Sequence, residues 1–301
     1  MILIDYSQVA LSAILTFQRE LKGSESEIKN LIRHVTLSTL KSYKKKYGKE
    51  YGELVICCDG RKYWRKEIFE HYKASRKKMR DSSDLDWKLI FDTLSEMRED
   101  IAKHFPYRVI HIERAEADDI IAAMTVWCQT NQLVKEGLVD EPQPILIMSS
   151  DKDFKQLQLT PFSSGNVRQW SPMQKKFVTA SKQEILEFTI EHIVKGDTGD
   201  GIPNILSADD VFVKGERQKP VSAKRMEEFL QVGRAACRSD DERRNWDRNA
   251  RLVAFDNIPT DVCNDIWNSY LNTKPTGDKM SIMNYLMEHR CRLLLDEIED
   301  F

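Results

Sequence analysis

The sequence predicts an α/β protein with a mostly parallel central sheet flanked by helices, followed by a smaller all-helical region. Short runs rich in Ile, Leu and Val recur along the first half of the chain, and helical patterns separate them. Strand signals stop after about residue 181. We therefore expect an α/β core over residues 1–180 and a helical region over residues 181–301.

Each expected element follows from its local pattern. Apolar runs of about strand length predict four strands, at residues 1–4, 54–58, 108–112 and 144–150. Helical patterns predict the connecting helices, at residues 27–47, 85–105 and 116–134. Strands that alternate with helices imply βαβ units and a parallel sheet. A hairpin is expected next, with strands at 167–170 and 175–179 and a turn at Ser171 and Pro172.

Composition narrows the class of protein. The 301 residues are 41% hydrophobic and 31% charged, which suits a globular protein with a good core. No apolar run reaches about 18 residues, so we expect no membrane span. The six cysteines form no CxxC pair, which is typical of reduced thiols in a cytoplasm.

Acidic residues follow three of the expected strands directly. Asp5 follows the first, Asp59 the second, and Asp151 and Asp153 the fourth. Because the carboxyl ends of parallel strands share one edge of a sheet, where ligand crevices form, we expect these acids to converge.

Two more acidic motifs have an ordinary alternative interpretation. Glu116, Asp118 and Asp119 open a helix, where a single acid commonly acts as a cap. Asp197 and Asp200 lie in GDTGDG, whose glycines are typical of a turn. Packed carboxylates stay ionised together only if a cation neutralises them, so the combination favours metal binding.

The chemistry of such a cluster is specific. Hard ions such as Mg²⁺ prefer carboxylate oxygens, and two ions about 3.5–4 Å apart can activate water and stabilise the leaving oxygen in phosphodiester cleavage. The net charge is −2, and without the nine acids of these motifs it would be +7. The overall charge therefore does not argue against a nucleic-acid substrate.

A basic segment supports the same interpretation. Between Arg61 and Arg80 nine Lys or Arg residues stand against two Glu, interleaved with four aromatic residues. Such a run is often only a solvated face. Aromatic residues among the charges favour nucleic-acid strand binding, because bases stack where phosphates pair.

In this order, the motifs ILIDYSQ, CCDG, YWRKEIFEHYKASR, EADDIIA, SSDKDF and GDTGDGIPN resemble those of the flap endonuclease (5′-nuclease) superfamily. Within it, phrases such as RQWSPMQKKFV and HIVKGD resemble the ribonucleases H of T-even-type tailed phages. The resemblance covers most of the chain, strongly to about residue 200. It implies a 5′-nuclease or PIN-like fold with a helical arch over residues 61–86.

The resemblance also implies residue roles. The acids expected around a first metal are Asp5, Asp59, Glu116 and Asp118, with Asp119 beside them. The acids expected around a second metal are Asp151, Asp153, Asp197 and Asp200. Within the arch, Tyr72, Lys73 and Arg76 match residues that grip the region of the scissile phosphate, and Lys77 joins them as a nucleic-acid contact. The expected catalytic residues are Lys73, Arg76, Asp5, Asp59, Asp118 and Asp151.

One segment departs from the family pattern. The second glycine hairpin of the family's helix–turn–helix motif is missing or displaced between GDGIPNI and VSAKRMEEF. We expect basic residues near this segment to contact duplex phosphates instead, with Lys224 and Arg225 among them.

The resemblance therefore implies a metal-dependent 5′-nuclease that acts as a 5′-3′ exonuclease and flap endonuclease and removes RNA primers in lagging-strand replication. The cofactor expected is two Mg²⁺ ions, for which Mn²⁺ can substitute. The partners expected are flap, nicked or forked DNA, RNA–DNA hybrids, a single-stranded-DNA-binding protein and other replication proteins, for a monomer in the host cytoplasm. The alternatives are an aspartate-nucleophile phosphatase and a non-catalytic nucleic-acid-binding scaffold.

Overall fold

The computed structural model describes residues 1–74, 76, 80, 83–129, 142–159 and 165–301. The chain forms two compact units. Unit 1 contains Met1–Arg61, Asp84–Thr179 and Thr260–Phe301, and unit 2 contains Lys62–Ser83 and Ala180–Pro259. The chain passes from unit 1 to unit 2 between Thr179 and Ala180, next to where the boundary between the two regions was expected. The units differ from the expected regions in two segments, because 62–83 belongs with unit 2 and 260–301 with unit 1.

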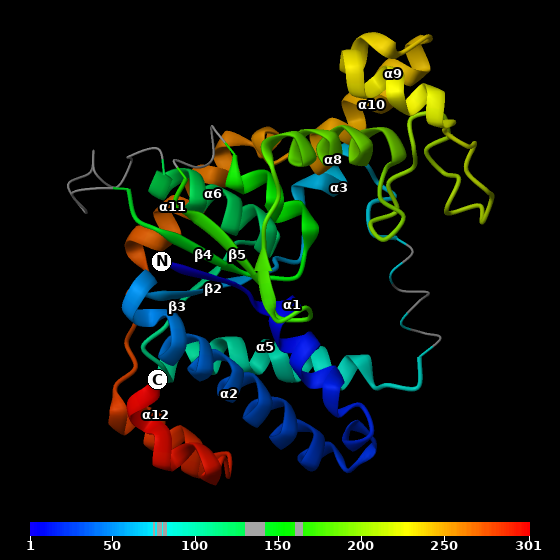
Figure 1. Cartoon of the computed structure of the whole chain (residues 1–301). Helices are drawn as coiled ribbons and strands as arrows, with labels where there is room; N and C mark the ends of the chain where they lie inside the picture. Colours follow the sequence, from blue (N-terminus) through cyan, green and yellow to red (C-terminus); the bar gives the residue numbers. More distant parts are fainter. Residues whose placement is uncertain (75, 77–79, 81–82, 130–141, 160–164) are drawn as a thin grey trace. The chain divides into compact units, whose positions relative to one another are not determined.

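A six-stranded sheet organises unit 1, in the order β3-β2-β1-β4-β5-β6 (Figure 1). Its strands are β1 (Ile2–Asp5), β2 (Leu54–Cys58), β3 (Arg108–His111), β4 (Ile145–Met148), β5 (Val167–Ser171) and β6 (Lys176–Val178). All neighbouring pairs are parallel except β5 and β6, which form the antiparallel hairpin. The prediction of a mostly parallel sheet is therefore confirmed.

Helices cover both faces of this sheet (Figure 1). One face carries α1 (Tyr6–Ile14), α2 (Glu25–Tyr51) and α5 (Trp87–His104), and the other carries α6 (Ala117–Gln129) and α11 (Thr260–Asn272). The helix α12 (Lys279–Glu288) packs against α5. The helices expected at 27–47 and 85–105 correspond to α2 and α5, and the one expected at 116–134 corresponds to α6. Residues 130–134 lie outside the described residues.

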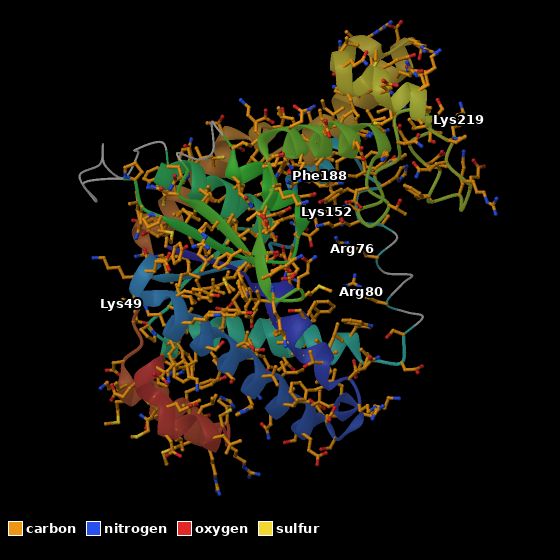
Figure 2. All side chains as sticks on the ribbon, in the orientation of Figure 1. Lys49, Arg76, Arg80, Lys152, Phe188 and Lys219 are labelled. Carbon is orange, nitrogen blue, oxygen red and sulfur yellow. The ribbon has the colours of Figure 1, made fainter. Side chains whose placement is uncertain are left out.

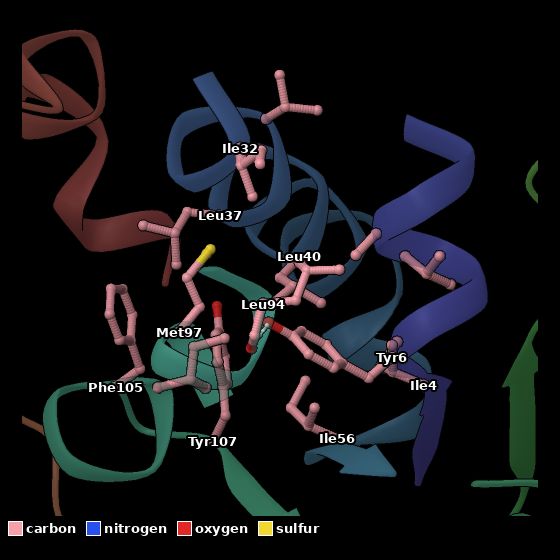
Figure 3. Packing of buried hydrophobic residues seen from close by; sticks show 14 of the residues in the cluster. Ile4, Tyr6, Ile32, Leu37, Leu40, Ile56, Leu94, Met97, Phe105 and Tyr107 are labelled. Atoms are coloured by element: carbon pink, nitrogen blue, oxygen red, sulfur yellow. Dashed lines mark hydrogen bonds between the residues drawn. The ribbon is translucent and has the colours of Figure 1, made fainter. Parts of the chain in front are cut away.

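Local sequence explains where the longest helix begins and ends. Ser24 and Glu27 form a reciprocal capping box at the start of α2, which satisfies two of the N–H groups that lack a helical partner. Gly52, at φ 87°, ends it. The apolar face of α2 packs on α5 and the first strands, where Ile32, Leu40 and Met97 are fully buried (Figure 3).

A buried tyrosine links this core to the carboxyl end of β1. Tyr6 directly follows Asp5, and its hydroxyl donates a 3.0 Å hydrogen bond to the carbonyl oxygen of Leu94 in α5 (Figure 3). Because a buried hydroxyl needs a partner, this bond fixes the start of α1 against α5. The core therefore holds the carboxyl end of β1 in place.

Within the described residues of unit 2, the regular secondary structure is helical apart from one isolated bridge between Asp197 and Ile202, and residues 196–222 form turns and loops. Its helices are α3 (Trp64–Ile68), α8 (Lys182–Lys195), α9 (Ala223–Val232) and α10 (Asp240–Val253). The core of this unit includes Phe229 stacked on Trp246, with ring centroids 5.5 Å apart. The fully buried Asn249 donates hydrogen bonds of 2.8 Å to the carbonyl oxygens of Ile193 and Pro203. Of the expected arch, α3 and a turn through Ala74 are described, and residues 75, 77–79, 81 and 82 are not.

None of the helices in the described parts of the chain combines the length and the apolar character needed to cross a bilayer.

Candidate metal centre

The strand order changes direction between β1 and β4. The chain runs outward from β1 through β2 to β3, and then returns to β4 on the other side of β1. In open α/β sheets, ligands bind outside the carboxyl ends of the strands at such a switch point. Seven acids follow these strand ends or open the helix α6, and we call them the carboxylate cluster: Asp5, Asp59, Glu116, Asp118, Asp119, Asp151 and Asp153.

Asp5 lies at the switch point itself. Its Oδ2 accepts a hydrogen bond of 2.9 Å from the Ser149 hydroxyl at the end of β4, and its Oδ1 accepts one of 3.2 Å from Gln8 N–H. Burial, followed by the negative charges of Asp59 and Asp151, raises the pKa of Asp5 to about 7. The acids that follow β1, β2 and β4 therefore interact electrostatically, as the sequence predicted.

Asp59 joins the end of β2 to the start of α6. Its Oδ1 accepts a 2.9 Å hydrogen bond from Ala117 N–H, and its Oδ2 accepts a 2.8 Å bond from the Ser7 hydroxyl. The next residue must be glycine, because a Cβ on Gly60 would lie 2.2 Å from the Ile112 carbonyl oxygen. This close approach brings the acid after β2 to the N-terminus of α6.

Three acids open α6 as one group. Glu116, Asp118 and Asp119 each offer a carboxylate oxygen, and these oxygens all lie within 4.8 Å of one another. Glu116 and Asp119 are buried, whereas Asp118 is partly exposed. Asp119 also acts as a cap, because its Oδ2 accepts a 3.0 Å hydrogen bond from Glu116 N–H. Capping and clustering are therefore both present at this helix start.

Asp151 and Asp153 begin the short 3₁₀ helix η3 (Lys152–Gln158) after β4. Asp151 caps it, since its Oδ1 accepts a 2.9 Å hydrogen bond from Asp153 N–H. The Ser149 hydroxyl accepts a 3.1 Å bond from Asp151 N–H while it donates to Asp5. One serine thus connects the acids that follow β4 to the acid that follows β1.

The residues of the carboxylate cluster fit a divalent metal. All of their side-chain donors are carboxylate oxygens, which hard cations prefer. The two nearby acids that raise the pKa of Asp5 would be neutralised by a bound cation. Asp5, Asp59, Glu116, Asp118, Asp119 and Asp151 are the residues that would hold it, with Asp153 next to them in the chain.

Unit 2 contains a second charged group, centred on Asp200. Its carboxylate accepts a 3.0 Å hydrogen bond from the Tyr72 hydroxyl, pairs with Arg76, and lies 3.7 Å from Lys73 Nζ. Lys73 has the left-handed φ of 58°, and its backbone N–H donates a 2.7 Å hydrogen bond to the Asp200 carbonyl oxygen. The structure therefore brings together three predicted arch residues and one predicted metal ligand.

Asp197 is held by a histidine that the sequence interpretation missed. His192 Nε2 lies 3.0 Å from its Oδ2, while its Oδ1 accepts hydrogen bonds from Gly199 N–H at 2.7 Å and Asp200 N–H at 3.2 Å. The His192 hydrogen bond is the largest of the effects that lower the pKa of Asp197 to about 2. Gly196, at φ 68°, has the left-handed backbone that this turn requires.

The remaining predicted contacts are more varied. Lys224 is exposed near the start of α9. Arg225 pairs with Glu228 at 2.8 Å and with Glu242 at 2.7 Å, and its guanidinium lies 4.6 Å from the Phe229 ring centroid. These contacts give Arg225 a packing role inside unit 2. Lys77 lies outside the described residues.

Four polar residues close to the acids were not predicted: Ser7, Gln8, Ser149 and His192. Each could have been found by its distance along the chain from an acid, since the first three lie within three residues of one and His192 lies five residues before Asp197. Serine and glutamine are common on any surface, so spacing alone is a weak signal.

Comparison with protein families identifies the chain. Residues 1–188 match the family model described as the 5′-3′ exonuclease N-terminal resolvase-like domain, and residues 184–301 match the T4 RNase H C-terminal model. Ribonuclease H of Enterobacteria phage T4 is 32% identical over 99% of this chain and 95% of its own length. Flap endonuclease Xni of Shewanella woodyi is 25% identical over 64% of this chain and 75% of its own length.

Solved structures show the same fold. The bacteriophage T5 D15 protein, crystallised with metal ions, aligns with a TM-score of 0.55 at 16% identity, covering 96% of this chain and 97% of that one. The T5 D15 flap endonuclease in complex with DNA and metal ions aligns with a TM-score of 0.54 at 18% identity, covering 96% and 98%. The chain therefore belongs to the 5′-3′ exonuclease family and is a divalent-metal-dependent nuclease.

Proposed function

We propose that this nuclease uses two Mg²⁺ ions to hydrolyse a phosphodiester at or near a 5′ end, in flap, nicked or forked DNA and in RNA–DNA hybrids. One observation carries the proposal. Acids from the ends of β1, β2 and β4 interact at one edge of the sheet, and Asp59 connects them to the acidic start of α6. A two-ion site needs such a concentration of carboxylates from several elements.

Hydrogen bonds within the protein orient two acids of the proposed site. Hydrogen bonds from Ser149 and Gln8 orient Asp5, and bonds from Ser7 and Ala117 orient Asp59. Two bound ions would supply Lewis-acid chemistry, activating water and stabilising the leaving 3′ oxygen. Carboxylates held in this way would position the ions before the substrate arrives.

Lys73 and Arg76 are proposed to neutralise charge on the scissile phosphate. In this structure both cations pair with Asp200, and Tyr72 donates to the same carboxylate. A phosphate would compete with that carboxylate for the same donors. The assignment of Asp197 and Asp200 to the second ion stays a prediction from the sequence.

Two rival functions explain less of the sequence. An aspartate-nucleophile phosphatase needs a D-x-D motif after the first strand, whereas Tyr6 and Ser7 follow Asp5. A non-catalytic scaffold would have to maintain a set of mutually repelling acids with no use for a cation.

The biological setting is proposed by similarity. The relative from phage T4 carries the name ribonuclease H, and the Shewanella relatives are named flap endonucleases. We propose RNA-primer removal and flap cleavage during lagging-strand replication, by a monomer in the host cytoplasm. We further propose that a single-stranded-DNA-binding protein and other replication proteins are its partners and that Mn²⁺ can substitute for Mg²⁺.

One gel tests the proposed function. A labelled flap, a nicked duplex and an RNA–DNA hybrid are each incubated with Mg²⁺, Mn²⁺ or EDTA. We expect release of short 5′ products with either metal and none with EDTA. Intact substrates in every lane would reject the proposal, and cleavage of a phosphomonoester alone would support the phosphatase.

A further inference from the structure

A polar cavity of about 320 Å³ lies beside the carboxylate cluster. Its lining comes entirely from unit 1, from the loop and 3₁₀ helix after β4 and from the hairpin β5–β6. Asp151 belongs both to this lining and to the carboxylate cluster. The cavity therefore opens next to the acids proposed to hold the metals.

Three lysines give this cavity its charge. Lys152, Lys155 and Lys176 line it, and Asp151 is the one acid among the lining residues. Lys152, which Figure 2 labels, and Lys176 are exposed, and Lys155 is partly buried, so solvent reaches this part of the lining. The carboxylates nearby would repel an anion, and three cations at the same cavity offset that repulsion.

Hydrogen bonds connect the residues that form the floor of the cavity. The Nε2 of the fully buried Gln169 donates to the carbonyl oxygens of Ser149 and Asp151, at 2.9 and 2.5 Å. Ser171 donates a 2.9 Å hydrogen bond to the Ser150 hydroxyl, which accepts from Met173 N–H at 3.1 Å. These bonds tie the hairpin to the loop that carries Asp151.

Gln169 also leaves one polar atom for another molecule. Because two carbonyl oxygens fix its nitrogen, the Oε1 must point away from them, and it has no hydrogen-bond partner among the described residues. A buried acceptor of this kind is normally satisfied by water or by a ligand donor. The floor therefore suits a hydrated ligand better than an apolar one.

We propose that this cavity, the lysine pocket of Lys152, Lys155 and Lys176, binds a backbone phosphate of the nucleic-acid strand next to the cleavage site. The inference rests on the proposed function, and it adds a phosphate subsite to the acids and to Lys73. Lysine suits this role because it is a compact point charge that contacts phosphate without reading sequence. Phe177 and Val178 belong to the remaining lining of the pocket.

The test is a salt titration of DNA binding without metal. Fluorescence anisotropy measures the affinity of a labelled flap in EDTA for the wild type, for the double variant Lys155→Met/Lys176→Met, and for the control Lys49→Met/Lys274→Met. The control lysines are exposed residues of unit 1 that do not line the pocket, and Lys49 lies on α2, well away from Lys152 (Figure 2). Both double variants remove the same total charge.

One phosphate contact contributes a slope of about 0.9 for duplex DNA, or about 0.7 for a single strand, to a plot of log affinity against log salt. We expect the pocket variant to lose about that much slope and the control to keep the wild-type value. Lys155→Arg/Lys176→Arg should restore the slope.

Two results would overturn the proposal: an unchanged slope in the pocket variant, or an equal loss in both variants. A third arm separates the strand from a released product, with inorganic phosphate and a 5′-mononucleotide as probes. These probes could raise the melting temperature of the wild type and not that of the pocket variant, while the salt slope stays the same in both proteins. That result would show that the pocket binds the released product, and it would reject binding of the strand. Binding in EDTA needs no catalysis. A protein that binds flaps but never cleaves them would therefore refute the proposed function and leave the proposed phosphate subsite standing.

Discussion

The hydroxyl of Ser149, at the end of β4, donates a 2.9 Å hydrogen bond to Oδ2 of Asp5, at the end of β1. This bond spans the two strands between which the sheet changes direction, and it lowers the pKa of Asp5 against the larger effects of burial and of Asp59. The serine thus keeps a larger fraction of Asp5 ionised near neutral pH. This matters for metal binding, because a carboxylate must be ionised to hold the metal.

Ser149→Ala should therefore weaken metal binding at pH 7. A hydrogen bond to a charged group contributes about 1.5–3 kcal/mol, so Mg²⁺ affinity should fall by roughly tenfold or more. The loss should shrink at pH 9, where Asp5 ionises without help. Isothermal titration at both pH values measures it, with Ser12→Ala as the control, because the Ser12 hydroxyl donates to the Val9 carbonyl oxygen within its own helix. An equal loss at both pH values would contradict this role.

Asp5→Asn should stabilise the metal-free protein in a pH-dependent way. The pKa of Asp5 is raised from 3.8 to about 7, so between these values the folded state binds more protons than the unfolded one. Stability from this group therefore falls as the pH rises from about 4 to 7, and asparagine removes that loss. Thermal melts in EDTA should show little difference from wild type at pH 4. At pH 8 the gain should reach a few kcal/mol, at about 1.4 kcal/mol per pKa unit.

The control for that experiment is Asp296→Asn, an exposed acid of unit 1. It should leave the pH dependence of the melting temperature as in the wild type. A gain for Asp5→Asn of the same size at pH 4 and pH 8 would show that the ionisation of Asp5 is not its cause.

Asp118→Asn tests the acids at the start of α6. Asparagine keeps the shape and removes the charge, so Mg²⁺-dependent cleavage of a flap should fall by orders of magnitude. Binding of the flap in EDTA should stay equal or tighten, because one negative charge facing the phosphates has gone. Asp261→Asn is the control, since that acid pairs with Arg114 at 2.6 Å. If Asp118 is only a helix cap, stability falls by about 1 kcal/mol or less and cleavage persists.

His192→Phe should lower the free energy of unfolding at pH 6 and change it much less near pH 2. His192 is the main cause of the lowered pKa of Asp197, from 3.8 to about 2. A lowered carboxyl pKa stabilises the folded state above pH 4, and the contribution disappears as the pH falls towards 2. The variant should lose about 1–3 kcal/mol at pH 6 in denaturant titrations and much less near pH 2.

Phe188→Leu is the matched control, because Phe188 contacts the same imidazole ring at 5.5 Å between centroids. It removes packing and leaves the hydrogen bond, so its loss of stability should not depend on pH. If the His192 variant shows the same pH-independent loss, its bond to Asp197 contributes nothing to stability.

Local pattern made much of this fold predictable. The strands were found because runs such as Leu54–Cys58 are apolar, β-branched and bounded by turns, and parallel pairing then placed Asp5, Asp59 and Asp151 at one edge. The division into units could not be predicted from local pattern, because the return of Thr260–Phe301 to unit 1 depends on long-range packing of α11 against α6. The role of Ser149 could not be predicted either, because its hydrogen-bond partner Asp5 lies 144 residues away in the chain.

The last prediction concerns Lys73, which is proposed to act on the phosphate during cleavage. Lys73 and Lys66 both approach the ring of Tyr63, each 5.4 Å from its centroid, and only Lys73 pairs with Asp200. Lys73→Met should therefore lower the rate of cleavage of bound substrate by about 10²-fold or more, as the loss of a group that stabilises developing charge does. Lys66→Met should change that rate little.

Single-turnover cleavage with enzyme in excess separates this rate from binding, which anisotropy measures in EDTA. Both variants remove one positive charge, so both should weaken DNA binding to a similar and small extent. A transition-state role predicts that only Lys73→Met slows the step after binding. If its affinity collapsed and bound flap were cleaved at the wild-type rate, Lys73 would be a docking residue, and the charge on the scissile phosphate would have to be neutralised by other groups.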